Sequence, residues 1–366
     1  MLNRRQVHGI DRPFLLTTLI LLGVGLVALY SASFQKAQMT GVSFLQRQLF
    51  YAGLGCGLSL VLVAIDYHRW LEWAYLLYAV NLVLLVLVLA MGTVRGGAQR
   101  WLSFGGMTIQ PSEFAKVSTI LALSRFLGAR PPATAGRWGP ILGATLIVLL
   151  PAVLILRQPN LGTASVFITI GLSALVVWGI PLKFLGILLV AGATLAPVIW
   201  GRLEDYQRSR LMVFMNPNLD PLGAGYTVIQ SRIAMGSGQL WGKGWLSGTQ
   251  NQLNFLPERH TDFIFSVIGE EWGILGTTFC LFLFALLFYR GFLIASQTRD
   301  PFGRLLIVGL VTMLAVHTLV NVGMVLGLMP VVGLPLPFMS YGGSWLMTCL
   351  VAVGIILSVG IRRPVF

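Results

Sequence analysis

Long apolar segments separated by short polar ones repeat along the whole chain. A helix needs about 20 mostly apolar residues to cross about 30 Å of hydrocarbon. Because hydrocarbon leaves the edge of an open sheet without hydrogen-bond partners, we expect the segments to be helices. The pattern predicts one all-α, polytopic membrane domain, residues 1–366, with ten transmembrane helices. Their apolar cores are residues 14–30, 49–65, 71–91, 114–127, 141–156, 163–178, 184–200, 263–289, 305–329 and 344–361.

Composition supports a membrane protein. Apolar residues make up 56% of the 366 residues and charged residues 10%, whereas soluble domains have about 45–50% and about 25%. These values exclude a soluble globular domain, a disordered chain and a disulfide scaffold. The first apolar segment is longer than the apolar region of about 7–15 residues in a cleavable signal peptide, so we expect an uncleaved helix.

The basic residues indicate topology. Lys and Arg number 25 against 12 acidic residues, a net charge of +13. Because these cations border apolar segments, we expect a membrane surface as their partner and no nucleic acid. With a cytoplasmic N-terminus, 13 of the 25 lie on the cytoplasmic side and 6 in short outer segments. This asymmetry predicts that both termini are cytoplasmic.

The remaining 6 cations lie in a long segment, residues 201–262, between the seventh and eighth predicted helices. We expect this segment to be an outer loop. Loops longer than about 12–15 residues are uncommon in compact domains and are usually functional. Its centre, residues 226–235, favours a short amphipathic helix on the membrane face.

The end of the long loop has four ionisable residues within five positions, directly before an apolar helix. They are Glu258, Arg259, His260 and Asp262. One interpretation is that Asp262 caps the helix by accepting backbone N–H bonds. The other is that this carboxylate acts as a general base. The two roles are compatible.

Below Asp262, a stripe of polar and small residues follows one helical face. It could be a close helix–helix seam. The acid at position 270 fits a seam poorly, since an intramembrane carboxylate normally faces a cavity or a partner. The stripe comprises Ser266, Gly269, Glu270, Gly273 and Thr277.

A second group of charged residues surrounds the fourth predicted helix. Pro111 suits its first turn, and Glu113 and Lys116 are i, i+3 neighbours that can pair. The pair could be a surface ion pair that contributes about 0–1 kcal/mol. Alternatively, Arg100 and Lys116 present cations to an anionic ligand, since Arg matches phosphate with a planar fork and Lys acts as a point charge.

Two further outer segments are irregular. Residues 157–163, which include Asn160, read as a tight turn. Residues 330–344, which include Ser340, hold three prolines and three glycines. Irregular backbone at membrane depth is tolerated only inside protein or beside a watery cavity. His317 and Asn321 share a helical face, where an interhelical hydrogen bond is expected.

The sequence contains no nucleotide-phosphate loop, no metal-ligand spacing and no nucleophile triad. The three cysteines lie in apolar runs without such spacing and read as buried hydrophobes. Four polar clusters on the outer side of ten helices favour an enzyme or transporter that handles an anionic, lipid-borne substrate.

Six motifs together resemble the SEDS (shape, elongation, division and sporulation) family, which includes RodA, FtsW and SpoVE. The resemblance runs from about residue 12 to about residue 362. The string ERHTD at residues 258–262, with GTQ at 248–250, is closer to the elongation-type RodA branch than to FtsW. The motifs are residues 96–101, 110–116, 220–226, 242–245, 257–265 and 335–343.

This resemblance implies a peptidoglycan glycosyltransferase. Such an enzyme polymerises lipid II at the periplasmic face of the bacterial inner membrane during cell elongation and rod-shape maintenance. It implies a class B penicillin-binding protein, the crosslinking transpeptidase, and other elongation-complex proteins as partners. The resemblance leaves room for a divalent cation, Mg²⁺ or Mn²⁺, at the pyrophosphate, although no motif requires one.

It also implies that Asp262 is the essential carboxylate, which we expect to be the general base on the acceptor sugar. Position 160 departs from the family, because Asn160 stands where Asp is usual; a hydrogen-bonding role survives there. A lipid II flippase, which needs no base, and a non-catalytic scaffold remain alternatives. The candidate substrate contacts are Arg100, Glu113, Lys116, Asn160, Arg259, His260, Glu270 and Ser340.

Overall fold

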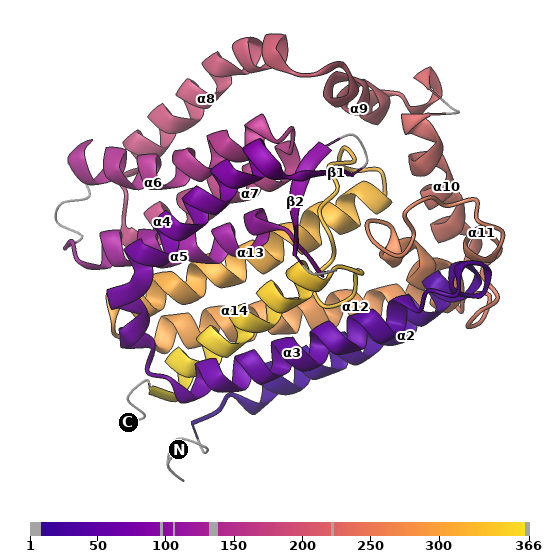
Figure 1. Ribbon diagram of the computed structural model, residues 1–366, viewed down its shortest axis with the longest axis horizontal. Helices are drawn as coiled ribbons and strands as arrows, with labels where there is room; N and C mark the ends of the chain where they lie inside the picture. Colours follow the sequence, from indigo (N-terminus) through magenta and orange to yellow (C-terminus); the bar gives the residue numbers. More distant parts are fainter. Residues whose placement is uncertain (1–8, 96–97, 105–106, 132–137, 221–222, 363–366) are drawn as a thin grey trace.

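The computed structural model describes residues 9–95, 98–104, 107–131, 138–220 and 223–362. Most of its helices lie side by side in one bundle, and the first and last described parts of the chain lie at the same end of it (Figure 1). Four of the cations used to predict topology, Arg4, Arg5, Arg137 and Arg363, lie outside the described residues.

Each of the ten predicted segments overlaps one long helix. Eight described helices are long and apolar enough to cross a membrane, and α5 and α8 are the other two. The total of ten spans stays a prediction. The helices are α2 (Arg12–Thr40), α3 (Phe44–Ala64), α4 (Tyr67–Met91), α5 (Pro111–Gly128), α6 (Trp138–Arg157), α7 (Leu161–Trp178), α8 (Leu182–Arg202), α12 (Ile264–Gln297), α13 (Pro301–Val325) and α14 (Gly343–Arg362).

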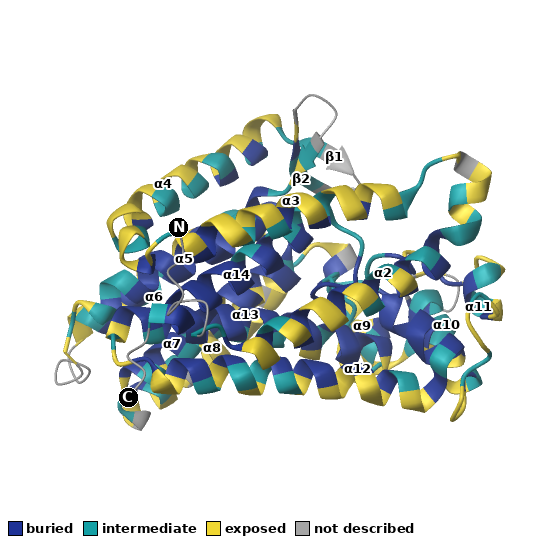
Figure 2. Cartoon of the chain, turned by 90° about the horizontal axis from the view of Figure 1, so that it is seen from below, coloured by how far each residue is buried: buried dark blue, intermediate teal, exposed yellow. Residues whose placement is uncertain are grey.

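The core forms around α5, α13 and α14, which are buried along most of their length (Figure 2). Close approach depends on glycines, as expected for helices that pack in a membrane. A Cβ added at Gly25 would lie 2.6 Å from the Met339 backbone, and one at Gly55 would lie 2.5 Å from Leu350. These contacts bring α2 and α3 against the end of the chain.

Helix α8 differs from the others because it lies away from the bundle (Figure 1). Its first turn packs Phe184 edge-on against Trp138 of α6, with ring centroids 4.8 Å apart. From Val190 to Val198 every residue is exposed. A membrane would therefore cover this apolar helix with lipid on several faces.

The fold is mostly helical, as predicted, and the segment between α4 and α5 is a local exception. A small antiparallel sheet lies there, with strand order β1-β2-β3. Its strands are β1 (Thr93–Arg95), β2 (Ala98–Phe104) and β3 (Met107–Ile109). Outside the hydrocarbon, water satisfies the sheet edges that lipid cannot, so the argument for helices does not apply. The sheet carries Arg100 on β2.

The long segment between α8 and α12 is mostly structured. It contains α9 (Asp205–Met215), η2 (Pro217–Leu219), α10 (Ala224–Ser237) and the short α11 (Thr249–Gln252). The helix predicted at residues 226–235 is confirmed as α10. It packs on α12, where the hydroxyl oxygens of Ser231 and Ser266 lie 2.8 Å apart. The small-residue stripe of α12 is therefore a seam, as one interpretation proposed.

Candidate active site

Asp262 lies in a turn just before α12. The helix begins at Ile264, and its N-cap residue is Phe263, which makes no side-chain cap bond. The interpretation of Asp262 as the N-cap is therefore wrong. Its carboxylate is not used to cap the helix and is available for chemistry.

Three separate donors fix the backbone of this turn. Because the main chain is held, the position of the Asp262 Cα and Cβ atoms is set without a bond to its carboxylate. The Ser340 hydroxyl, a predicted substrate contact, instead holds this backbone. The Tyr341 N–H donates to the carbonyl of residue 260 at 2.9 Å, and the Ser340 hydroxyl donates to that of residue 261. The Asn321 side-chain amide donates to the carbonyl of residue 262 at 2.9 Å.

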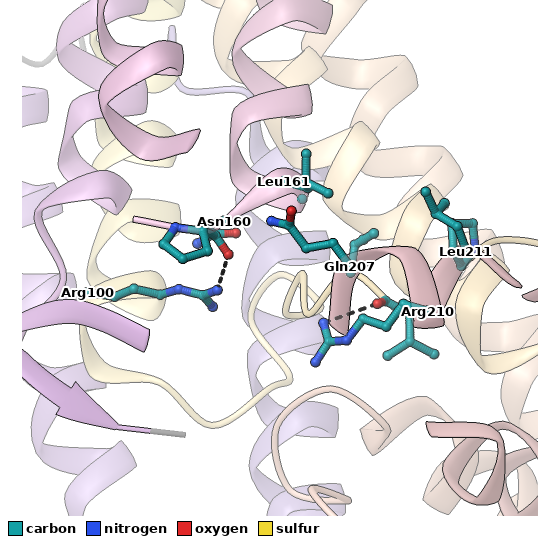
Figure 3. Close-up of a pocket in the computed structure, with 11 residues that line it drawn as sticks. Arg100, Asn160, Leu161, Gln207, Arg210 and Leu211 are labelled. Atoms are coloured by element: carbon teal, nitrogen blue, oxygen red, sulfur yellow. Dashed lines mark hydrogen bonds between the residues drawn. The ribbon is translucent and has the colours of Figure 1, made fainter. Parts of the chain in front are cut away.

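A small pocket, partly open to solvent, lies where four parts of the chain meet. These are β2, the turn before α7, helix α9 and the irregular segment after α13. Figure 3 shows Arg100 and Arg210 on two sides of it, with Gln207 between them. The lining residues include Arg100, Asn160, Gln207, Arg210, Val331 and Val332.

Backbone carbonyls hold the two arginines at this pocket. Arg100 donates from Nε to the carbonyl of Gln158 at 3.2 Å and from Nη2 to the carbonyl of Pro159. Arg210 donates from Nη1 to the carbonyl of Val331 at 3.2 Å. The guanidinium groups are thus preorganised, and planar guanidinium forks match phosphate oxygens well.

The carboxylate of Asp262 is not part of the pocket lining but lies near one of its walls. A Cβ built on Gly333 would lie 3.5 Å from Oδ2 of Asp262, and residue 333 directly follows the pocket wall at Val332. Burial, with the nearby Glu258 charge, raises the pKa of Asp262 to about 6, while Arg210 and Arg100 act in the opposite direction. Both arginines therefore share an electrostatic environment with the acid.

Asn160 also lines the pocket, and its side chain has a structural bond. Its Oδ1 accepts a bond from the Thr163 N–H at 3.1 Å and caps α7. The predicted tight turn is confirmed. Since a neutral amide can make this bond, the fold accommodates Asn where the family usually has Asp.

The pair of Glu113 and Lys116 lies inside the bundle. Nζ of Lys116 is 2.7 Å from Glu113 Oε2, 2.9 Å from His317 Nε2 and 4.2 Å from the ring centroid of Trp345. The surface-pair interpretation is wrong, because Lys116 is fully buried. In this arrangement neither residue presents a face to a phosphate.

Through His317, this buried group contacts the irregular segment after α13, part of which lines the pocket. Nδ1 of His317 lies 3.2 Å from the carbonyl of Pro335. A neutral ring that donates from Nδ1 can accept from Lys116 at Nε2. The buried cluster thus reaches the irregular segment that carries Val331, Val332 and Gly333.

Removing one partner of the pair should destabilise the protein strongly. We expect Lys116→Met to lower the free energy of unfolding by about 3–5 kcal/mol, because it leaves a buried, unpaired Glu113. The double variant Glu113→Gln/Lys116→Met should recover most of that loss. Unfolding curves of the purified variants measure both. A double variant no more stable than the single one would contradict this account.

Arg259 and His260 lie close to Asp262 in sequence but are not part of the pocket lining. Arg259 donates from Nε to the carbonyl of Ala32 in α2 at 2.8 Å. The ring centroid of His260 lies 5.0 Å from that of Phe44. Burial, with the charge of Lys36, lowers the pKa of His260 to about 4, so its ring is neutral at pH 7. The structure places both in protein contacts, and their role as substrate contacts stays a prediction.

Glu270 is also occupied by protein. Its carboxylate is fully buried and accepts from Lys243 Nζ at 2.8 Å, Gln250 N at 2.9 Å and Asn251 N at 3.2 Å. The expectation that this acid faces a partner is confirmed, and the partner is Lys243. The pair lies outside the pocket lining.

Sequence reasoning missed Arg210 and Gln207. The arginine was counted only as a cation of a long loop, because nothing local to it indicates a site. One signal was available: the string DYQRSRLMVFM, residues 205–215, has helical character within a segment already expected to be functional.

Comparison with known proteins decides the family. The sequence model of the family described as "Cell cycle protein", which covers FtsW, RodA and SpoVE, matches residues 12–363. The chain belongs to this family. It is 41% identical over 361 residues to the peptidoglycan glycosyltransferase MrdB of Escherichia coli strain K12, covering 98% of this chain and 95% of that one.

Solved structures agree. A chain from a structure on polymerisation and crosslinking by a peptidoglycan synthase complex superposes with a TM-score of 0.83 and 34% identity, covering 97% of this chain and 98% of that one. The crystal structure of the Thermus thermophilus rod shape determining protein RodA superposes with a TM-score of 0.72 and 31% identity, covering 97% of each chain. The SEDS fold predicted from the motifs is thereby confirmed, as is a multi-pass membrane protein.

Proposed function

We propose that this chain is a peptidoglycan glycosyltransferase that polymerises lipid II into glycan strands during cell elongation, with its active site on the periplasmic face of the inner membrane. The observation that carries the proposal is a half-buried carboxylate near a pocket whose two arginines are held by backbone carbonyls. The name of the Escherichia coli relative, a peptidoglycan glycosyltransferase, supports the same activity.

The carboxylate suits the nucleophilic half of the reaction. A sugar hydroxyl of one lipid-linked glycan attacks the anomeric carbon of another, forming a glycosidic bond. The bond from that carbon to pyrophosphate breaks, and undecaprenyl pyrophosphate leaves with the electron pair. Asp262 accepts the hydroxyl proton as the new bond forms. A positioned base of this kind contributes about 10²–10⁴-fold.

The arginines suit the leaving half. Negative charge grows on the pyrophosphate as it departs, and fixed cations stabilise such charge without reorganising. Arg100 and Arg210 already have backbone partners in the pocket that hold them in place. The lipid tail of the substrate needs an apolar route, and the exposed apolar side of α8 beside the pocket helix α9 offers one.

A divalent cation could bind near Asp262 only if the substrate supplied some of its ligands. Among the described residues, no group of three or more His, Cys, Asp or Glu side chains comes together to hold a metal. Mg²⁺ is commonly bound by one or two carboxylates plus substrate phosphates. Asp262 and the pyrophosphate oxygens would hold such an ion, which would supply charge neutralisation.

We further propose a class B penicillin-binding protein and other elongation-complex proteins as partners. The similar solved chain belongs to a complex described as coordinating polymerisation and crosslinking. We also propose that both termini are cytoplasmic, because the cations predicted for that side outnumber those in the short outer segments. The proposed membrane is the inner membrane, because the proposed substrate, lipid II, is polymerised at its periplasmic face.

Reconstitution tests the activity. The chain, purified with its partner and supplied with lipid II, should make glycan strands that a gel resolves. A flippase would instead move labelled lipid II across vesicles without polymer, and a scaffold would do neither while still binding the partner. Either of these outcomes from folded, partner-bound protein would defeat the proposal.

The pKa of Asp262 predicts the acid side of the pH profile. A general base must be ionised, and the pKa of this carboxyl is raised to about 6. Polymerisation should therefore fall as pH drops through about 6, losing about tenfold per pH unit below it. The rate should be near its plateau at pH 7.5. Rates across pH 4.5–8 check this; an unchanged rate at pH 5 would rule out the assignment.

A further inference from the structure

Helix α12 is broken a short way below Asp262, a feature that the proposed reaction does not use. At Gly273 the backbone adopts φ 65° and ψ −160°, a conformation open essentially to glycine. The break separates residues 264–272 from the longer part, residues 274–297. Broken helices are tolerated at membrane depth only where other groups satisfy the interrupted backbone.

Here the preceding segment satisfies it. We call residues 239–245 the wedge. The N–H groups of Ile274 and Leu275 donate to carbonyls of residues 239 and 240, at 2.8 and 3.3 Å. In the other direction, the N–H groups of Lys243 and Gly244 donate to carbonyls of residues 270 and 271, each at 3.0 Å. The wedge is thus joined to α12 by main-chain bonds on both sides of the break.

Glycine makes this approach possible. A Cβ added at Gly242, where φ is +81°, would lie 2.1 Å from the Glu271 carbonyl oxygen, and one at Gly273 would lie 2.4 Å from the Gly242 nitrogen. The motif at residues 242–245, which the active site does not use, therefore has a structural reason. Between its glycines, Lys243 turns inward to the buried Glu270.

The large exposed side chains of the wedge are apolar, with Gln239 as its one exposed polar side chain. Trp241 is 79% exposed and Leu240 is 58% exposed, while Trp245 lies with its ring 5.7 Å from that of Tyr30 in α2. The residues to which the wedge is bonded, Ile274 and Leu275, are themselves more than half exposed. They begin the apolar outer surface of a candidate membrane span.

We propose that the wedge is a membrane anchor whose tryptophans insert into the outer leaflet of the bilayer, at the boundary between headgroups and acyl chains. Main-chain bonds hold it level with the first lipid-facing residues of α12, so its exposed face continues the lipid-facing surface. Tryptophan favours this boundary because its ring is apolar and its N–H polar. The one cation of the wedge is neutralised inward by Glu270, which leaves an uncharged outward face.

The anchor has a consequence for the long outer segment. Its chain runs from the wedge through α11 to the Asp262 turn. Fixing the wedge in the leaflet fixes the height of that turn relative to lipid headgroups. The inference concerns membrane contact alone and stands whether or not the chain polymerises lipid II.

Depth measurement tests it. The three native cysteines of the full chain are replaced by Ala, and one nitroxide label is attached at Trp241→Cys. The labelled protein is reconstituted without its partner in vesicles of phosphatidylethanolamine and phosphatidylglycerol. The ratio of nitroxide relaxation by oxygen, which dissolves in the bilayer, to relaxation by a water-soluble nickel complex gives the depth of the label in the bilayer. We expect the label about 5–10 Å below the headgroup level. Two controls calibrate the scale: Gln38→Cys, exposed at the outer end of α2, and Phe282→Cys, exposed on α12 below the break.

The result expected is that position 241 falls between the two controls. Relaxation by the nickel complex as strong at 241 as at 38 would overturn the proposal. So would protection that develops only when a penicillin-binding protein is added, because the surface would then bind protein. Each labelled cysteine variant should keep the oligomeric state and thermal stability of the unsubstituted chain, which shows that it reports location in folded protein.

Discussion

Replacing Asp262 by Asn should lower the rate of glycan polymerisation by about 10²–10⁴-fold, the largest effect that we expect from a single substitution in this chain. The amide has nearly the shape of the carboxylate but cannot accept the acceptor proton. The turn should persist, because it is held through the main-chain carbonyls of residues 260–262 and not through the side chain. Gel-resolved glycan from lipid II measures the rate.

Glu258 provides a matched control, four positions away in the same turn. It is exposed, and its charge is one cause of the raised pKa of Asp262. Glu258→Gln should therefore keep most of the activity and move the acid side of the pH profile downward. If both variants lost activity equally, the loss would reflect damage to the turn. If Asp262→Asn kept the normal rate with a folded, partner-bound protein, the carboxylate would not be the base.

The turn also shows what sequence can reveal about a site. Four ionisable residues before an apolar helix singled out Asp262 as the candidate base, because a carboxylate at an interface can accept a proton. Their spacing did not show that Arg259 and His260 point elsewhere. Those directions depend on α2 and α3, which are more than 200 residues earlier in the chain.

Helix positions were predictable because hydrocarbon imposes one length and one periodicity. The sheet at residues 93–109 was missed because that constraint ends where water begins. The pairing of Glu113 with Lys116 follows from spacing on a helix, but their burial does not. It depends on His317 and Trp345, which come from α13 and α14. Arg210 was missed because local spacing does not reveal contacts between distant segments, and α9 lies at the pocket only in the folded chain.

Replacing Arg100 or Arg210 by Gln should each lower the polymerisation rate by about 10²–10³-fold. Each change removes a fixed cation from the pocket where the pyrophosphate is proposed to leave. Lipid II binding should weaken less than the rate, because charge on the leaving group grows toward the transition state. Single-turnover rates and binding of labelled lipid II separate the two. Loss of binding with an unchanged rate of bound substrate would place the arginines in recognition only.

The pH profile gives these variants a second signature that a folding defect would not produce. Arg210 and Arg100 both act to lower the pKa of Asp262 against its burial. Removing either cation should raise that pKa above about 6, so the acid side of the profile moves to higher pH. Arg210→Lys keeps the charge and should restore the position of the profile even if the lost planar fork keeps the rate low. If the pH profile did not move in either Gln variant, the guanidinium groups would not affect the pKa of Asp262. The pKa would then no longer support placing the two arginines and Asp262 in one active site.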